Sequence, residues 1–202
     1  MKRSAMMLLA AGILLAGEAW AETFQVEHDH FWRSCKGRLI FGDKTVEYIA
    51  DNKEHSRSWT YEDIQQLALV PGRISILTYK IRKIDLGADQ AFNFKLLAGK
   101  LSDSFRQEME KKLARPIVSG IVPDTTEVRF AIPARHRQFL KDSQGTLEFS
   151  EDYILYRSAE GSNSRIWQYD ALLSVGSIGP FQLRLGALQK TGGEYGEEKN
   201  YV

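Results

Sequence analysis

Cysteine is almost missing from this 202-residue sequence, which contains Cys35 and no other. An intramolecular disulfide needs two cysteines, so the fold must be stabilised by the burial of apolar side chains. The length is enough for two small domains, each with a core of its own. The thiol of Cys35 is expected to be buried as a small apolar group, with a reactive or intermolecular thiol as the alternative.

An excess of charge of one sign is also absent. The sequence has 27 basic and 26 acidic residues, which leaves a formal net charge of +1. Proteins that bind nucleic acid normally carry a basic excess, because neutralising phosphates supplies much of their affinity. Attachment to anionic lipid by charge alone would need the same excess. The balance of charge therefore argues against both kinds of partner.

No apolar run is long enough for a helix that crosses a membrane. The most apolar stretch, Ala5 to Ala16, has about a dozen residues, whereas a helical span needs roughly 20. Lys2-Arg3 precedes this stretch and Ala19-Trp20-Ala21 follows it, which is the order of an export signal and its cleavage site. Residues 1–21 are thus predicted to be a signal peptide that is cleaved before Glu22. The remaining chain is expected to be periplasmic or extracellular, with no transmembrane span.

Motifs that carry common enzyme chemistry are missing as well. The sequence contains no glycine-rich loop of the phosphate-binding kind and no serine in a nucleophile elbow. Glu108 and Glu110 are expected on the solvent side of a helix. We therefore predict no catalytic residue and no cofactor, and we expect that the protein is not an enzyme.

Histidine is scarce, with His28, His30, His55 and His136 as the four examples. His28 and His30 alternate on an expected strand, so both rings would lie on one face and could begin a zinc or copper site. Such a site needs a third ligand, and Asp29 would point to the other face of the strand. The alternative is a structural histidine, hydrogen-bonded within the fold, which His136 repeats.

What the sequence does contain is one stretch that it carries twice. Between His28 and Tyr61, ten of thirty-four positions are identical to the residues 108 positions later, without a gap. Such repetition indicates a duplicated structural unit. The repeated positions expected to form the core of the two copies are Gly37, Leu39, Phe41, Tyr48, Trp59 and Tyr61, and then Gly145, Leu147, Phe149, Tyr156, Trp167 and Tyr169.

Each copy is predicted to be built mainly of short β-strands. Leu39 and Phe41 alternate with Arg38 and Ile40, as on a half-buried strand, and residues 42–44 have the composition of a tight turn. A crossing segment is expected at 63–67. Further strands of the first copy are expected at 45–49, 58–61, 73–79, 80–85 and 91–96, and strands of the second at 145–149, 153–156, 165–169 and 181–185.

A helix is predicted to follow the first copy. Large apolar residues recur at helical spacing between residues 101 and 113, Ser102 is suited to cap the N-terminus, and the helix must end before Pro116. At the offset of 108, Phe94 corresponds to Val202, so a counterpart of this helix is not expected in the second copy. The predicted organisation is a first domain at 22–115, a linker at 116–126 and a second, incomplete domain at 127–202.

This order of features resembles the pleckstrin-homology-like superfold. The resemblance rests on a Gly-x-Leu-x-Phe strand, a second strand ending in Tyr, a Trp-x-Tyr strand and a final helix. It covers residues 24–115 well and residues 130–202 in part. It implies two tandem small barrels, the first closed by its C-terminal helix. Family members that bind phosphoinositides cluster basic residues around the first hairpin. Here that hairpin holds only Lys36, Arg38 and Lys44, so inositol-phosphate binding is not carried over.

The repeated aromatic residues allow two interpretations. Bases or sugars could stack on the Trp-x-Tyr pairs at 59–61 and 167–169, but recurrence at the same place in both copies favours core packing. The Ser-Arg pairs at 56–57 and 164–165 could contact an anion. Alternatively, the first of these arginines stacks on the adjacent tryptophan or pairs with Asp63.

From these features we expect an exported, non-enzymatic protein that binds a protein or peptide partner, or that self-associates to hold a larger assembly. A carrier of a lipid or another small hydrophobic molecule in the barrel mouth is the alternative, and a metal-dependent enzyme is a third possibility. Without a closing helix, the second copy would have an uncovered apolar mouth, which natural proteins usually mask. We expect this mouth to be covered by the first copy, by a second molecule or by a partner, unless the chain is shortened.

Overall fold

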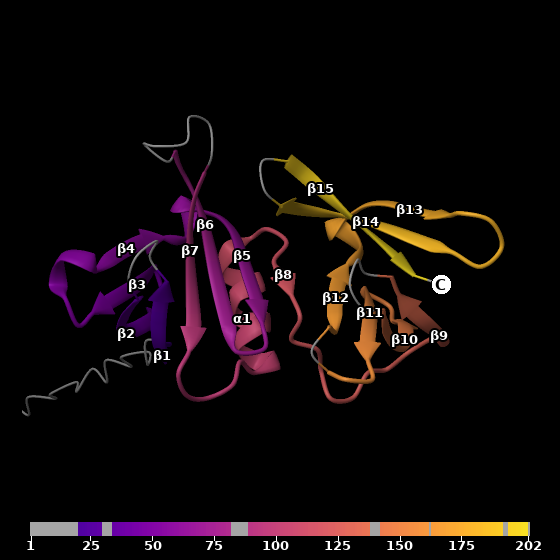
Figure 1. Cartoon of the computed structure of the whole chain (residues 1–202), viewed down its shortest axis with the longest axis horizontal. Helices are drawn as coiled ribbons and strands as arrows, with labels where there is room; N and C mark the ends of the chain where they lie inside the picture. Colours follow the sequence, from indigo (N-terminus) through magenta and orange to yellow (C-terminus); the bar gives the residue numbers. More distant parts are fainter. Residues whose placement is uncertain are drawn as a thin grey trace, which may run out of the picture.

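The computed structural model describes residues 20–29, 34–81, 89–137, 142–161, 163–191 and 194–201. Within them the chain is mainly β, with fifteen strands in one sheet and a single α-helix of 11 residues (Figure 1). The prediction of a mainly-β protein is therefore confirmed. The expected signal peptide lies outside the described residues, apart from Trp20 and Ala21.

The first unit, residues 22–115, contains seven strands and then the helix α1. Its strands pair in the order β5-β6-β7-β1-β2-β3-β4. The elements are β1 (Glu22–Asp29), β2 (Ser34–Phe41), β3 (Thr45–Ala50), the one-turn helix η1 (Lys53–His55), β4 (Arg57–Thr60), η2 (Tyr61–Asp63), β5 (Ile64–Val70), β6 (Arg73–Ile81), β7 (Asp89–Leu96) and α1 (Asp103–Leu113).

The alternation of apolar and polar residues sets the faces of these strands. Leu39 and Phe41 on β2 are fully buried, whereas Arg38 between Gly37 and Leu39 is exposed. The predicted turn at 42–44 joins β2 to β3 and is closed by a hydrogen bond of 2.9 Å from the Gly42 N–H to the Thr45 carbonyl. Side chains two residues apart thus meet in the core, as the pattern predicts.

The structure differs from the expected strands in several places. In the second unit, the strand expected at 181–185 begins at residue 183 and extends to residue 191. Residues 63–67, expected as a crossing segment, form the end of η2 and the start of β5. The register between β5 and β6 shifts near Gln66, which interrupts the alternation in the sequence and hides the strand. Residues 73–81 are one continuous strand, β6, instead of two strands that break after residue 79.

The predicted helix is confirmed as α1, Asp103–Leu113. Its N-terminus is capped by Ser102, whose hydroxyl oxygen accepts a hydrogen bond of 3.1 Å from the Phe105 N–H. It ends at Ala114, which adopts the left-handed conformation with φ of 46°. Phe105 and Met109 are buried against the first unit, so α1 covers an apolar face of the sheet.

The second unit, residues 127–202, repeats the strand order of the first. Its strands pair in the order β13-β14-β15-β9-β10-β11-β12. No α-helix follows β15 within the described residues. The elements are β9 (Phe130–His136), β10 (Ser143–Phe149), β11 (Tyr153–Ser158), β12 (Arg165–Gln168), the one-turn helix η3 (Tyr169–Ala171), β13 (Leu172–Ser177), β14 (Leu183–Thr191) and β15 (Glu194–Tyr201).

Residues 116–126, expected as a linker, connect the two units through hydrogen bonds. The strand β8 (Val118–Ser119) pairs in parallel with β5 and antiparallel with β12. Figure 1 shows β8 running between the two units. Further along, the Arg157 guanidinium donates a hydrogen bond of 2.9 Å to the Pro123 carbonyl. This segment therefore joins the two halves into one continuous sheet.

Closed barrels are not confirmed. The described strands form one sheet that begins at β13 and ends at β4. Each unit has one edge strand next to the other unit, β5 in the first and β12 in the second, and both bond to β8. Because these edges pair with β8, they do not meet the opposite edge of their own unit. No ring of hydrogen-bonded strands closes among the described residues.

Each unit has its own apolar core. The larger core lies in the first unit and includes side chains of α1. The smaller core lies in the second unit and contains Leu147, Ile154, Tyr156, Trp167 and Leu185. Within the described ranges, no helix combines the length and the hydropathy that a membrane crossing requires.

Candidate functional site

Several residues repeated in the two units make the same hydrogen bond in each. The Tyr48 hydroxyl donates to the Cys35 carbonyl at 2.7 Å, and the Tyr156 hydroxyl donates to the Ser143 carbonyl. Burial raises the pKa of Tyr48 to about 12, so its phenol keeps its proton and remains a donor well into the alkaline range. These hydrogen bonds link neighbouring strands, so a structural role is sufficient to explain why the tyrosines are repeated.

The repeated glycines allow these tyrosines to approach the sheet. A Cβ on Gly37 would lie 2.8 Å from the Tyr48 ring and would collide with a backbone carbonyl of β3. A Cβ on Gly145 would lie 2.9 Å from the Tyr156 ring and would meet the corresponding carbonyl of β11. Only glycine fits at such a close approach. Glycine and tyrosine therefore recur as a pair.

The repeated serines are also structural. The Ser56 hydroxyl oxygen accepts a hydrogen bond of 3.1 Å from the Ala50 N–H. In the second unit, the Ser164 hydroxyl oxygen accepts one of 3.0 Å from the Ser158 N–H. Each serine thus holds the loop that connects its third and fourth strands.

The arginine that follows the first of these serines contacts backbone carbonyls. Arg57 donates to the carbonyls of Glu54 at 3.0 Å and Ser56 at 2.7 Å. It does not pair with Asp63, whose carboxylate accepts a hydrogen bond of 2.9 Å from the Thr60 N–H. The alternative of an ion pair between Arg57 and Asp63 is therefore wrong, because the carboxylate caps η2 instead.

The structure places Trp59 and Trp167 in the cores of their units. The Trp59 ring packs edge-on against Phe92, with 4.8 Å between ring centroids. Their burial leaves no exposed ring face on which a base or sugar could stack.

Tyr169 is a correction to the expected core of the second unit. Its side chain is 43% exposed, whereas the equivalent Tyr61 is 9% exposed. Both hydroxyls donate to the backbone, Tyr61 to the Gly42 carbonyl at 2.8 Å and Tyr169 to the Ser150 carbonyl at 3.0 Å. The two differ because α1 covers Tyr61: its Lys112 lies 5.8 Å from the Tyr61 ring centroid.

His28 is buried among aromatic rings. Its ring centroid lies 5.7 Å from that of Tyr48, and the repeated His136 lies 5.8 Å from Tyr156. His30, the other candidate ligand, lies outside the described residues. Within the described ranges, no group of three or more histidine, cysteine, aspartate or glutamate side chains could hold a metal ion. The contact between His28 and Tyr48 therefore recurs in the second unit between His136 and Tyr156.

Cys35 is not an isolated apolar group. Its side chain is half-buried, and its Sγ lies 2.8 Å from Nδ1 of His55. The thiol and the imidazole are therefore within hydrogen-bonding distance. In the second unit these positions are Ser143 and Asn163, so the pair is not part of the repeat. The two residues are 20 positions apart, and no motif in the sequence signals their proximity.

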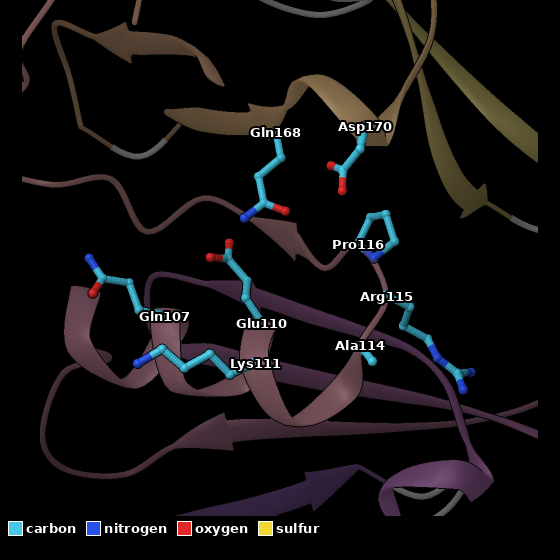
Figure 2. Close-up of a pocket in the computed structure, with 8 residues that line it drawn as sticks. All are labelled: Gln107, Glu110, Lys111, Ala114, Arg115, Pro116, Gln168 and Asp170. Carbon is cyan, nitrogen blue, oxygen red and sulfur yellow. The ribbon is translucent and has the colours of Figure 1, made fainter. Parts of the chain in front are cut away.

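A polar cleft of about 450 Å³ lies between α1 and the second unit (Figure 2). Figure 2 shows the side chains of Glu110 and Gln168 directed toward one another across it. Six of its eight lining residues are polar or charged, which differs from the mostly apolar sites that enclose hydrophobic ligands. These six are Gln107, Glu110, Lys111, Arg115, Gln168 and Asp170.

The expectation that Glu110 lies on the solvent side of α1 is wrong. Its carboxylate forms an ion pair of 2.5 Å with the buried Arg106, which also pairs with Asp103 at 2.8 Å. Burial raises the pKa of Glu110, the adjacent Arg106 opposes this rise, and the charges of Asp103 and Asp170 add to it. This side of the helix faces Gln168 and Asp170 of the second unit across the cleft, and helical periodicity cannot reveal such a neighbour.

The second unit also presents an apolar surface that we call the open face, formed by Phe130, Ile132, Phe149 and Tyr169. Phe130 and Phe149 are stacked, with 4.4 Å between their ring centroids. Ile132 is 41% exposed, and Phe149 is only partly buried. Exposed apolar residues that gather in this way are typical of interaction sites.

The open face corresponds to the surface that α1 covers in the first unit. Phe24 pairs with Leu39 in the first unit, as Ile132 pairs with Leu147 in the second, at the same offset of 108. Phe24 is 5% exposed, and its ring centroid lies 5.0 Å from that of Phe105 on α1. The two surfaces differ in two respects. A helix covers the first and none covers the second within the described residues, and Phe130 of the open face takes the place of Glu22 in the first unit.

No known family model matches the chain, and no curated protein matches it. One solved structure, described as "Structure of the Spt16D Pob3N heterodimer", aligns with 83% of this chain and 82% of that chain. The TM-score is 0.33 and the sequence identity is 7%. A likeness of this degree carries no argument about fold or function, so the interpretation depends on the chain's own residues.

Proposed function

We propose that this chain is an exported, non-enzymatic scaffold protein that binds another protein through the open face of its second unit. Its two halves are proposed to be tandem pleckstrin-homology-like units. The repeated order of seven strands and the helix that follows the first set support this assignment. The basic, apolar and small-residue order of residues 1–21 supports export to the periplasm or beyond.

The main support for this proposal is that equivalent residues are buried in the first unit and exposed in the second. Two positions that are buried in the first unit, Phe24 and Tyr61, have the exposed counterparts Ile132 and Tyr169 in the second. Leaving large apolar groups in water forgoes about 1.5–3 kcal/mol for each side chain that could be fully buried. A partner that covers this surface would recover part of that free energy, as α1 does within the first unit.

A carrier of a lipid or another small hydrophobic molecule is less well supported. Such a ligand is held by an enclosing site with mostly apolar walls. The cleft beside Glu110 is lined mainly by charged and amide side chains, and the open face is a surface. The polar lining of the cleft and the exposure of the open face therefore favour a macromolecular partner.

Capture of partners from a periplasmic extract would test the proposed function. Proteins bound to the chain are fixed by chemical cross-linking in the extract and then identified. The wild-type chain and Ile49→Glu are expected to capture the same proteins, whereas Ile132→Glu is expected to lose them. Ile49 is a matched control, because it is an isoleucine in the first unit with 39% exposure, close to the 41% of Ile132. Identical capture by Ile132→Glu and wild type would refute a role for the open face.

A further inference from the structure

The first unit shows what kind of element covers this surface. Phe105 of α1 packs edge-on against Phe41, with 4.9 Å between ring centroids, and Phe24 lies on its other side at 5.0 Å. Met109, one turn further along the helix, is fully buried. One side of an amphipathic helix thus supplies the apolar contacts.

A lysine completes the contact at the other end of α1. Lys112 forms an ion pair of 3.1 Å with Asp43, and its ammonium group lies over the Tyr61 ring. The second unit has an acid and a tyrosine at the same positions, Glu151 and Tyr169. Both are exposed. Glu151 already forms an exposed ion pair of 3.2 Å with Arg129, which a lysine of the helix would have to share or replace. The exposed Tyr169 ring remains accessible to such a lysine.

We propose that the open face binds an amphipathic α-helix of a partner protein, in the position that α1 occupies on the first unit. The helix carries an aromatic residue, a large apolar residue four positions later and a lysine seven positions later. These positions correspond to Phe105, Met109 and Lys112 of α1. This inference rests on the proposed function and specifies the chemistry of the partner.

A second copy of the chain does not supply this helix. Phe105, Met109 and Leu113 of α1 are all buried on their own first unit. Releasing α1 to a neighbouring molecule would expose those side chains together with Phe24 and Phe41. The occupant is therefore not α1 of a second copy, and we assign it to a helix of a different protein.

The test uses a peptide with the sequence of residues 101–115, blocked at both ends and labelled with a fluorophore, as a stand-in for the partner helix. Titration with the full chain is expected to raise the fluorescence anisotropy to saturation. Ile132→Glu is expected to weaken binding about tenfold or more, as loss of about 1.4 kcal/mol would do. Ile49→Glu should leave the affinity unchanged, and an alanine at the peptide position of Phe105 should weaken it.

Three results would overturn this inference. The first is the absence of saturable binding, and the second is binding that Ile132→Glu does not weaken, because the peptide would then occupy another surface. The third is a dimer in sedimentation that Ile132→Glu dissociates, since the open face would then bind a second copy. If Ile132→Glu abolishes the capture of proteins from the extract but the peptide does not bind, the proposed function stands and only the helical partner is rejected. If neither Ile132-dependent capture nor peptide binding is found, the proposed function and the helical partner are both rejected.

Discussion

Phe41 and Phe149 allow the effect of a covering helix on stability to be measured within one protein. They are the same residue at equivalent positions of the two units, separated by the repeat offset of 108. Phe41 is fully buried beneath Phe105, whereas Phe149 is partly exposed and stacks on Phe130. Replacing each with alanine therefore compares one truncation with and without a helix above it.

The expected costs follow from burial. Phe41→Ala removes a ring enclosed on all sides, so it loses the transfer free energy and leaves a cavity, at a cost of about 3–5 kcal/mol. Phe149→Ala removes a ring that is already partly in water, and its removal opens a notch to solvent. We expect that variant to cost about 1–2 kcal/mol, because the transfer contribution is smaller and little closed cavity remains.

Hydrogen exchange measured by mass spectrometry separates the two units. The slowest amides of each unit report the free energy of its opening, so each variant is assessed on the peptides of its own unit. We expect the protection of the β2 and β3 peptides in Phe41→Ala to fall by more than that of the β10 and β11 peptides in Phe149→Ala. Equal losses would refute the idea that α1 accounts for the difference between the two surfaces.

Gly37→Ala and Gly145→Ala should each lower the stability of their own unit by about 1–3 kcal/mol, because the new Cβ meets backbone and a tyrosine ring; unchanged urea midpoints would contradict this. EDTA should leave the melting temperature of the wild type and of His28→Ala unchanged, and a fall that zinc reverses would indicate a metal site. For Glu110, whose folded pKa is raised above its usual value of 4.5, the folded state binds the proton more tightly than the unfolded chain does. The stability of the wild type relative to Glu110→Gln should therefore fall as the pH rises from about 4 to 7 in urea titrations, and a rise would show that Arg106 dominates instead.

Local patterns in the sequence were sufficient for much of the fold. The alternation around Leu39 and Phe41 predicts a strand, and Ser102 with the apolar spacing after it predicts α1 and its N-terminus. These signals act between residues a few positions apart, so they can be read without knowing what lies on the other side of the element. The repeat extended the same interpretation to the second unit.

The tertiary structure decided which of these surfaces are covered. Phe41 and Phe149 have the same identity and the same place on a strand, yet α1 buries the first. Glu110 belongs to the polar side of its helix and nevertheless lies in a cleft that faces the second unit. Burial depends on elements that are distant in the chain and meet only after folding. The sequence by itself therefore determined the duplicated strands and the helix, and only their packing in space determined that the second unit has an open face.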